Sequence, residues 1–158
     1  GMAASGVSAG GTLAMNLAYG GNSAIPVRFV FELAAPTYFV AEDWGSLMKS
    51  DNLGSEEEFY RMMTGKELSA QEYRQEIKKI SPTCLVGEDS VPTLIGYGLK
   101  DHCVPADQKE YLIDALEKNG VSYDYVEFPH SNHLLYGDLD KMQTFMDLSL
   151  EYCKKYFQ

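Results

Sequence analysis

Two apolar runs of strand length constrain the fold of this chain more than any other feature. The first is VRFVFELA at residues 27–34, and the second is VPTLIGYG at residues 91–98. A strand that is buried on both faces of a parallel sheet has such a nearly continuous hydrophobic sequence, whereas a strand with one wet face alternates. The two runs therefore predict a parallel sheet that is covered on both faces.

The segments around these runs complete an alternating order of strands and helices. We expect two further strands, at 2–7 and 122–128, and helices at 9–20, from about Pro105 to Asn119, and at 138–156. Proline is favoured in a first helical turn, and Asn-Gly is typical of a helix end. The order predicts an α/β fold, a parallel sheet with crossover helices. We expect residues 1–158 to form a single domain.

Residues 36–82 differ from the rest of the chain because they are polar and charged. Ser55 and Ser69 each precede a glutamate by three residues, which is the spacing of a capping box and predicts a short helix after each serine. Gly65 is expected to end the first of these helices. The segment is therefore predicted to be a helical insertion that leaves the sheet.

Length and charge exclude some classes of function. The 158 residues are 45% hydrophobic, which suffices for one sizeable core, and the formal net charge of −10 argues against nucleic acid or an anionic membrane as partner. No apolar run approaches the ~20 residues of a membrane-spanning helix, and no secretory leader is evident, so we expect a cytoplasmic protein. The spacing of Cys84, Cys103 and Cys153 matches no zinc or redox pair, which predicts free thiols.

Three side chains of complementary chemistry follow three different strands. Ser8 lies in GVSAGG after the first expected strand, Asp101 follows the third, and His133 follows the fourth. The carboxyl ends of parallel strands share one rim of the sheet, and ligands of α/β folds bind there. The Gly-x-Ser-x-Gly spacing and the chain order Ser, Asp, His are those of a nucleophile elbow with its partners.

These residue types suit nucleophilic catalysis. A serine hydroxyl is a weak nucleophile, so an imidazole must accept its proton during attack, and a carboxylate on the other ring nitrogen fixes the tautomer. We therefore expect Ser8 as nucleophile, His133 as base and Asp101 as the orienting acid. Gly6 and Gly10 flank the serine, and we expect a side chain at either position to clash with the neighbouring strand or helix.

Each of these residues also has a structural interpretation. Ser8 stands where a helix cap would stand, and Asp101 can cap a turn. Asp107 is a second candidate acid, although the positive end of the following helix also accounts for it. His130 is an alternative to His133 as base, since one of the two histidines can simply bond the backbone.

Three neighbouring features are interpreted as structural. His102 is expected to be a solvated loop residue, and Cys103 a buried or half-buried thiol. Glu56–Glu58 reads as the acidic first turn of a helix, and we expect no metal site there.

The motifs around these residues resemble the α/β-hydrolase superfamily, most closely its esterase/lipase branch. The resemblance is carried by GVSAGGTLA at 6–14, VPTLIGYGLKDHCVP at 91–105 and VEFPHSNHLL at 126–135. By this resemblance Ser8 matches the nucleophile, Asp101 the acid and His133 the base. The amide of Ala9 matches one donor of the oxyanion hole, and residues 36–82 take the place of the lid or cap.

The resemblance implies a serine hydrolase that needs neither metal nor organic cofactor. It implies a carboxylesterase or lipase that cleaves a small-molecule ester through an acyl-enzyme. A peptidase of the same superfamily is a further alternative.

The sequence departs from the family before the elbow. There the family has about half of its fold, including a His-Gly-Gly loop that supplies another oxyanion donor, and this sequence has no counterpart. We therefore expect a truncated α/β-hydrolase fold. The strand at 2–7 would lie at an open sheet edge, which predicts a homodimer or a partner chain docked there. The alternative to an enzyme is a weakly active or non-catalytic remnant, or one part of a split or mis-started hydrolase, that serves as an interaction module.

Overall fold

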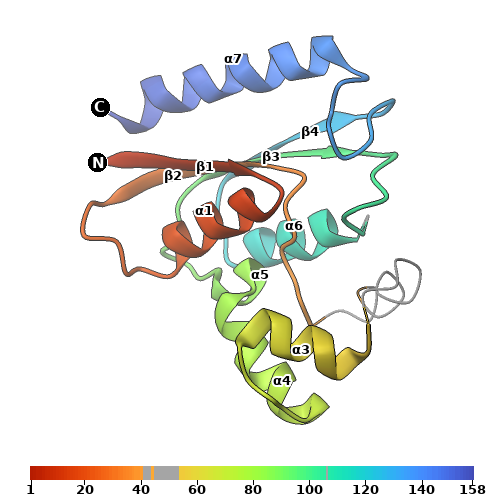
Figure 1. The fold of residues 1–158 in the computed structure, drawn as a ribbon. Coiled ribbons are helices and arrows are strands. Elements are labelled where there is room, and N and C mark those ends of the chain that lie inside the picture. Colours follow the sequence, from red (N-terminus) through yellow and green to blue (C-terminus); the bar gives the residue numbers. More distant parts are fainter. Residues whose placement is uncertain (41–43, 45–53, 106) are drawn as a thin grey trace.

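The fold is built on a sheet of four parallel strands (Figure 1). The structure is a computed structural model that describes residues 1–40, 44, 54–105 and 107–158. The strands lie side by side in chain order, and they are β1 (Met2–Val7), β2 (Val27–Leu33), β3 (Thr93–Gly98) and β4 (Tyr123–Phe128). All six residues of β3 are buried, as the second apolar run predicted. The predicted α/β class is confirmed.

Helices cover both faces of this sheet, giving three layers (Figure 1). One face carries α1 (Ala9–Tyr19) and α6 (Gln108–Lys118), and the other carries α7 (Leu139–Tyr156). The core between the sheet and the first pair includes Met15, Ile95 and Leu112. The core beneath α7 includes Phe29 and Phe145. None of the helices in the described ranges is both long and apolar enough to cross a membrane.

A second group of helices lies outside the sheet, in the region predicted as an insertion (Figure 1). Its elements are α3 (Glu56–Thr64), α4 (Ala70–Glu76), the 3₁₀ helix η1 (Ile77–Ile80) and α5 (Pro82–Leu85). Ser55 and Ser69 form the two predicted capping boxes, and Gly65 ends α3 in a left-handed conformation. Residues 41–43 and 45–53 of the expected 36–82 insertion lie outside the described residues.

The insertion is anchored to the sheet domain through a buried glutamine that sequence patterns did not single out. Gln108 is fully buried, and its Oε1 accepts hydrogen bonds of 2.8 Å from the N–H groups of both Thr37 and Tyr38. Its Nε2 donates to the Tyr38 carbonyl at 3.1 Å. One side chain at the start of α6 therefore fixes the backbone where the chain leaves β2.

Most predicted boundaries agree with the structure to within two residues, but the start of α6 does not. The helix begins at Gln108 rather than near Pro105. The Gln108 N–H donates to the Pro105 carbonyl at 3.1 Å, so Pro105 belongs to the turn before the helix. Its end is as predicted, with Asn119 as the cap and Gly120 at a positive φ of 68°.

Candidate active site

Ser8 occupies a strained turn between β1 and α1. Its φ of 54° and ψ of −129° lie in a region that residues with a side chain rarely adopt. The Ser8 N–H donates to the Leu33 carbonyl of β2 at 2.8 Å, and the Ser8 carbonyl accepts from the Gly11 N–H at 2.9 Å. The side chain makes no capping hydrogen bond. Ser8 therefore stands at the N-cap position of α1, as the cap interpretation expects, but its side chain does not cap the helix.

The glycines around Ser8 differ from the expectation in one respect. A Cβ at Gly6 would lie 2.2 Å from the backbone carbon and oxygen of Gly10, so this position is crowded as predicted. A Cβ at Gly10 would have no neighbour within 4 Å outside its own helix, so the expected clash there is wrong. Gly11 is the second crowded position, because a Cβ there would lie 2.7 Å from Ala35 Cβ. Gly10 faces outward in α1, whereas Gly11 faces β2.

The structure brings Ser8, His133 and Asp101 into one chain of hydrogen bonds. His133 Nε2 lies 2.9 Å from Ser8 Oγ, and His133 Nδ1 lies 2.8 Å from Asp101 Oδ2. The geometry fits a neutral imidazole whose Nδ1–H donates to the carboxylate while Nε2 accepts from the hydroxyl. The Asp101 side chain is 3% exposed and that of His133 is 18% exposed. Solvent therefore competes little for the bond between them.

Asp101 uses its two oxygens for two different tasks. Oδ2 contacts His133, while Oδ1 accepts hydrogen bonds from the N–H groups of Cys103 at 2.8 Å and Val104 at 3.0 Å. The turn-capping interpretation and the proposed contact with histidine are therefore both satisfied by one carboxylate. Asp107 is the residue before α6 and makes no capping bond with its side chain.

His130 belongs to a separate network that closes the loop carrying His133. Its Nδ1 lies 2.7 Å from Asp138 Oδ1, and its N–H donates to Asp138 Oδ2 at 2.9 Å. Ser131 Oγ donates to the same oxygen at 2.6 Å and accepts from the Gly137 N–H at 3.0 Å. Burial by itself raises the pKa of Asp138, but the hydrogen bonds from Ser131 and His130 outweigh it and bring the pKa below its usual value. Asp138 thus holds the two ends of the loop together.

Sequence reasoning missed this role of Asp138. The only local signal was an acid immediately before the last helix, which is also a common capping position. Its actual partners lie seven and eight residues upstream, so only the closed loop reveals them.

Cys103 differs from the expectation. It was expected to be buried or half-buried, but it is exposed, because it follows the Asp101 turn on the outer rim of the sheet. Its thiol, an oxygen of Asp101 and a ring nitrogen of His133 all lie within 4.8 Å of one another. Cys84 and Cys153 are also free thiols, as predicted, and His102 is exposed as expected.

Ala9 is the first residue of α1, where a backbone N–H has no acceptor within the helix. Within the described ranges no backbone carbonyl accepts a hydrogen bond from it. Its N–H follows directly on Ser8, so it is available to a ligand of the serine.

A second buried carboxyl group lies close beneath this turn. Glu32 of β2 is fully buried, and its Oε2 accepts from the Ala35 N–H at 2.9 Å. A Cβ at Gly11 would lie 3.2 Å from Glu32 Cβ, so the residue supports the floor of the turn. Burial raises the pKa of Glu32 well above its usual value, and the hydrogen bond from Ala35 offsets this only in part. The sequence signal that could have indicated this buried carboxyl group is the single acidic residue within the first apolar run.

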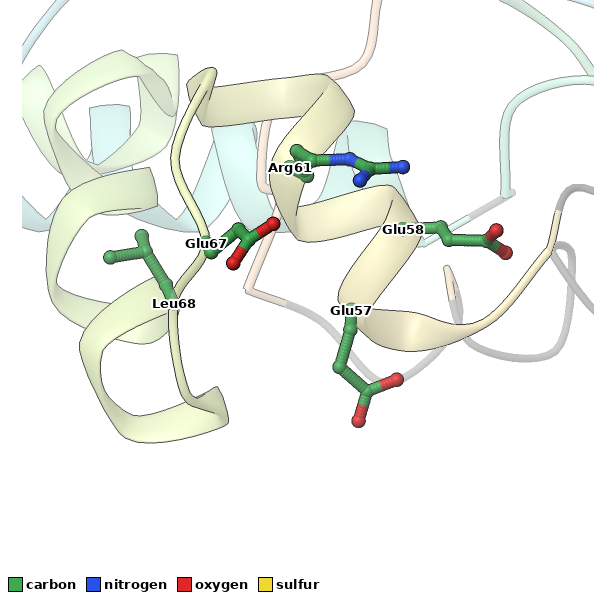
Figure 2. Close-up of a pocket in the computed structure, with 5 residues that line it drawn as sticks. All are labelled: Glu57, Glu58, Arg61, Glu67 and Leu68. Carbon is green, nitrogen blue, oxygen red and sulfur yellow. The ribbon is translucent and has the colours of Figure 1, made fainter.

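A recess between α3 and α4 lies apart from these residues (Figure 2). It has a volume of about 280 Å³ and is lined by Glu57, Glu58, Arg61, Glu67 and Leu68. Figure 2 shows Glu57, Glu58 and Arg61 on α3, with Glu67 and Leu68 on the segment leading to α4. Neither Ser8 nor His133 lines it, so the candidate active site is on the sheet rim.

The chain is similar to proteins of a known family. The model of the prolyl oligopeptidase family matches residues 1–158. The chain belongs to the prolyl oligopeptidase family. A comparison with curated proteins finds no match.

Solved structures agree with the α/β-hydrolase fold. A truncated carbohydrate esterase from gut microbiota has a TM-score of 0.70 and 18% identity, over 98% of this chain and 59% of its own. An esterase from Thermogutta terrifontis has a TM-score of 0.68 and 21% identity, over 97% of this chain and 55% of its own. An acylaminoacyl peptidase from Pyrococcus horikoshii has a TM-score of 0.68 and 17% identity, over 98% of this chain and 23% of its own. The chain thus spans little more than half the length of these esterases.

Proposed function

We propose that this member of the prolyl oligopeptidase family is a serine hydrolase that cleaves small carboxylic esters. Ser8 Oγ attacks the ester carbonyl carbon while His133 Nε2 takes its proton. Asp101 Oδ2 stabilises the imidazolium, and the Ala9 N–H donates to the oxyanion. His133 then protonates the leaving alcohol. Water attacks the acyl carbon next, His133 takes its proton, and the same proton returns to Ser8 Oγ as the acid is released.

The hydrogen bond of 2.9 Å between Ser8 Oγ and His133 Nε2 carries this proposal. It joins residues 125 positions apart in the sequence, and Ser8 also has a strained backbone, a feature that recurs at active sites. The esterases among the similar structures support an acyl substrate.

Peptide hydrolysis is the second candidate, because the family is named for peptidases and an acylaminoacyl peptidase shares the fold. Esters are favoured here because of the extent of the structural similarity. The carbohydrate esterase and the Thermogutta terrifontis esterase are covered over 59% and 55% of their own length, whereas the acylaminoacyl peptidase is covered over 23%.

The helical insertion fits the role of a lid over the acyl pocket. It leaves the sheet at the carboxyl end of β2, the strand beside β1, and Gln108 fixes that exit. Ser8 is bonded to Leu33 at the same strand end. The insertion therefore starts from the rim on which the ester would bind.

A fluorophosphonate probe tests the catalytic proposal, followed by mass spectrometry of the labelled peptide. We expect label on Ser8, loss of both label and p-nitrophenyl acetate hydrolysis in Ser8→Ala, and no loss in Ser5→Ala. Ser5 is a suitable control because it lies in β1, three residues before Ser8, and is exposed. A folded Ser8→Ala variant that hydrolyses the ester as fast as the parent would overturn the proposal, and a folded parent that takes no label would favour the non-catalytic interaction module.

We further propose that a second copy of this chain covers the open edge at β1. β1 is a terminal strand of the sheet, and Val7, Leu13 and Leu17 beside it are 55%, 70% and 42% exposed. Residues 1–27 contain no charged side chain, although the chain carries −10 overall, so this face is free of the repulsion that would oppose self-association.

Light scattering on the purified chain tests this second proposal. We expect a dimer in the parent and a monomer in Leu13→Glu. The control is Leu150→Glu, since Leu150 is 57% exposed on α7, across the sheet. A monomeric parent at high micromolar concentration would contradict the proposal.

A further inference from the structure

The rim of the sheet holds a thiol, that of Cys103, which ester hydrolysis does not require and which lies beside two of the proposed catalytic side chains. Cys103 is exposed and lies on the same turn as Asp101, whose Oδ1 accepts the Cys103 N–H at 2.8 Å. One donor atom from each of Asp101, Cys103 and His133 lies within 4.8 Å of the other two. Among the described residues, this is the group of three such side chains that comes close enough to share an ion.

We propose that Asp101, Cys103 and His133 bind a thiophilic divalent cation of the Zn²⁺ type, which switches the hydrolase off. Thiolate, imidazole and carboxylate are the donors that Zn²⁺ prefers, and three protein ligands leave a fourth position for water. A thiolate in the set disfavours Mg²⁺ and Ca²⁺, which select oxygen ligands. The ion would therefore be a soft one.

The distances are compatible with such an ion after a small adjustment. Zn²⁺ bonds of about 2.0–2.3 Å in a tetrahedron place neighbouring donor atoms about 3.3–3.7 Å apart. Two donors at the upper limit of 4.8 Å would have to approach by about 1 Å, and closer donors by less. Cys103 can supply this movement because its exposed side chain rotates without displacing the core. The bond of 2.8 Å between Asp101 and His133 must open by about half an ångström.

Binding at either ring nitrogen of His133 would interrupt catalysis. At Nε2 the ion takes the lone pair that accepts the Ser8 hydroxyl. At Nδ1 it replaces the hydrogen bond to Asp101, the ring proton moves from Nδ1 to Nε2, and Nε2 then has no lone pair for the serine proton. The thiol gives its proton to solvent on binding, and no group changes its oxidation state. The inhibitory part of this inference rests on the proposed function, but the binding part does not.

Co²⁺ titration tests the binding part without any need for activity, because a thiolate bound to Co²⁺ gives a charge-transfer absorption in the near ultraviolet. We expect this absorption in the parent, its loss in Cys103→Ser, and its retention in Cys84→Ser, which removes another exposed thiol. His133→Ala should weaken binding and His102→Ala should not. Circular dichroism establishes that each variant is folded. Absence of the absorption in the folded parent, or its persistence in Cys103→Ser, would overturn the proposed site.

Zn²⁺ inhibition of fluorophosphonate labelling tests the second part. We expect Zn²⁺ to slow the labelling of Ser8, EDTA to restore it, and Cys103→Ser to raise the half-inhibitory Zn²⁺ concentration by at least about tenfold. Each variant is compared with its own metal-free rate. Binding of Co²⁺ with undiminished labelling in Zn²⁺ would refute the inhibitory role. A parent that binds Co²⁺ but takes no label even without metal would refute the proposed function and its inhibition together, and leave the metal site standing.

Discussion

The two glycines of the Gly-x-Ser-x-Gly motif have opposite surroundings, so Gly6→Ala and Gly10→Ala form a matched pair. In the motif the two glycines look equivalent. The structure predicts that Gly6→Ala disrupts the turn and that Gly10→Ala stabilises the protein. Both changes add a single methyl group within five residues of each other. Their comparison therefore isolates the geometry of the turn from general effects of composition.

The magnitudes follow from the distances. At Gly6 the new Cβ would lie 2.2 Å from the carbon and oxygen of Gly10 and 2.5 Å from the nitrogen of Gly11. These are backbone atoms at the start of α1, so the helix must shift by about 1 Å, at a cost of about 3 kcal/mol or more. The shift separates Ser8 Oγ from His133 Nε2. At Gly10 there is open space, and alanine in a helix is about 1 kcal/mol more stable than glycine.

Thermal unfolding and the rate of fluorophosphonate labelling measure both effects. For a chain of this size, 1 kcal/mol corresponds to a shift of about 2–4 °C in Tm. We expect Gly10→Ala to raise Tm by that amount with labelling retained, and Gly6→Ala to lower Tm by about 6 °C or more with labelling lost. A Gly6→Ala variant that unfolds and labels like the parent would refute the reasoning, and so would a Gly10→Ala variant that is the less stable of the two.

Other predictions concern the carboxyl groups. Protonated Glu32 contributes stability that is complete below the usual carboxyl pKa and is lost as pH rises through its raised pKa. The Tm of Glu32→Gln relative to the parent should therefore increase as pH rises above the usual carboxyl pKa, and a difference that does not change with pH would contradict this. Asp101→Asn should slow labelling of Ser8 on the order of 10³-fold or more, because the amide no longer fixes the tautomer of His133, and a loss below tenfold would count against the proposed role. Asp138→Asn should lower Tm and slow labelling at neutral pH, since the loop that carries His133 loses its central acceptor, and both effects should fade toward acid, where the parent carboxyl is itself protonated.

Local patterns were sufficient for most of the fold. The continuous apolar run around β3 has one consistent solution, a strand covered on both faces, and the capping boxes at Ser55 and Ser69 depend on residues three positions apart. The chain order of Ser8, Asp101 and His133 was informative because a parallel sheet gathers its strand ends on one rim. Each of these inferences needs only a short stretch of sequence and a rule about backbone geometry.

What sequence reasoning missed depends on neighbours that are distant along the chain. Gly10 looks equivalent to Gly6 until α1 is placed on β2, when Gly11 proves to be the residue that faces the sheet. The residues next to Cys103 in the sequence do not indicate whether its side chain is buried. Cys103 is exposed in the turn that the hydrogen bond from its N–H to Asp101 Oδ1 stabilises. Gln108 looks like a surface residue of an amphipathic helix, but it is buried because the chain crosses it after β2.

The alternatives posed for Asp101 also show why residue types alone could not decide its role. From the sequence, a turn cap and a partner for histidine are alternative roles, yet a carboxylate has two oxygens and enough lone pairs for both. The turn fixes the position of Oδ1, and Oδ2 is thereby aimed at His133. The structural role is thus the means by which the side chain is oriented.

The same principle extends to the whole rim. Hydrogen bonds of the sheet continue past the strand ends into the loops that carry the site: Ser8 N–H donates to Leu33 at 2.8 Å, and Lys100 N–H donates to Ser131 at 3.0 Å. The serine turn, the acid turn and the histidine loop are therefore each bonded to a neighbouring strand or loop, and their relative positions are set by the sheet. Substitutions that distort the strand ends should separate Ser8 from His133, whereas substitutions on the outer faces of α3 and α4 should leave that distance unchanged.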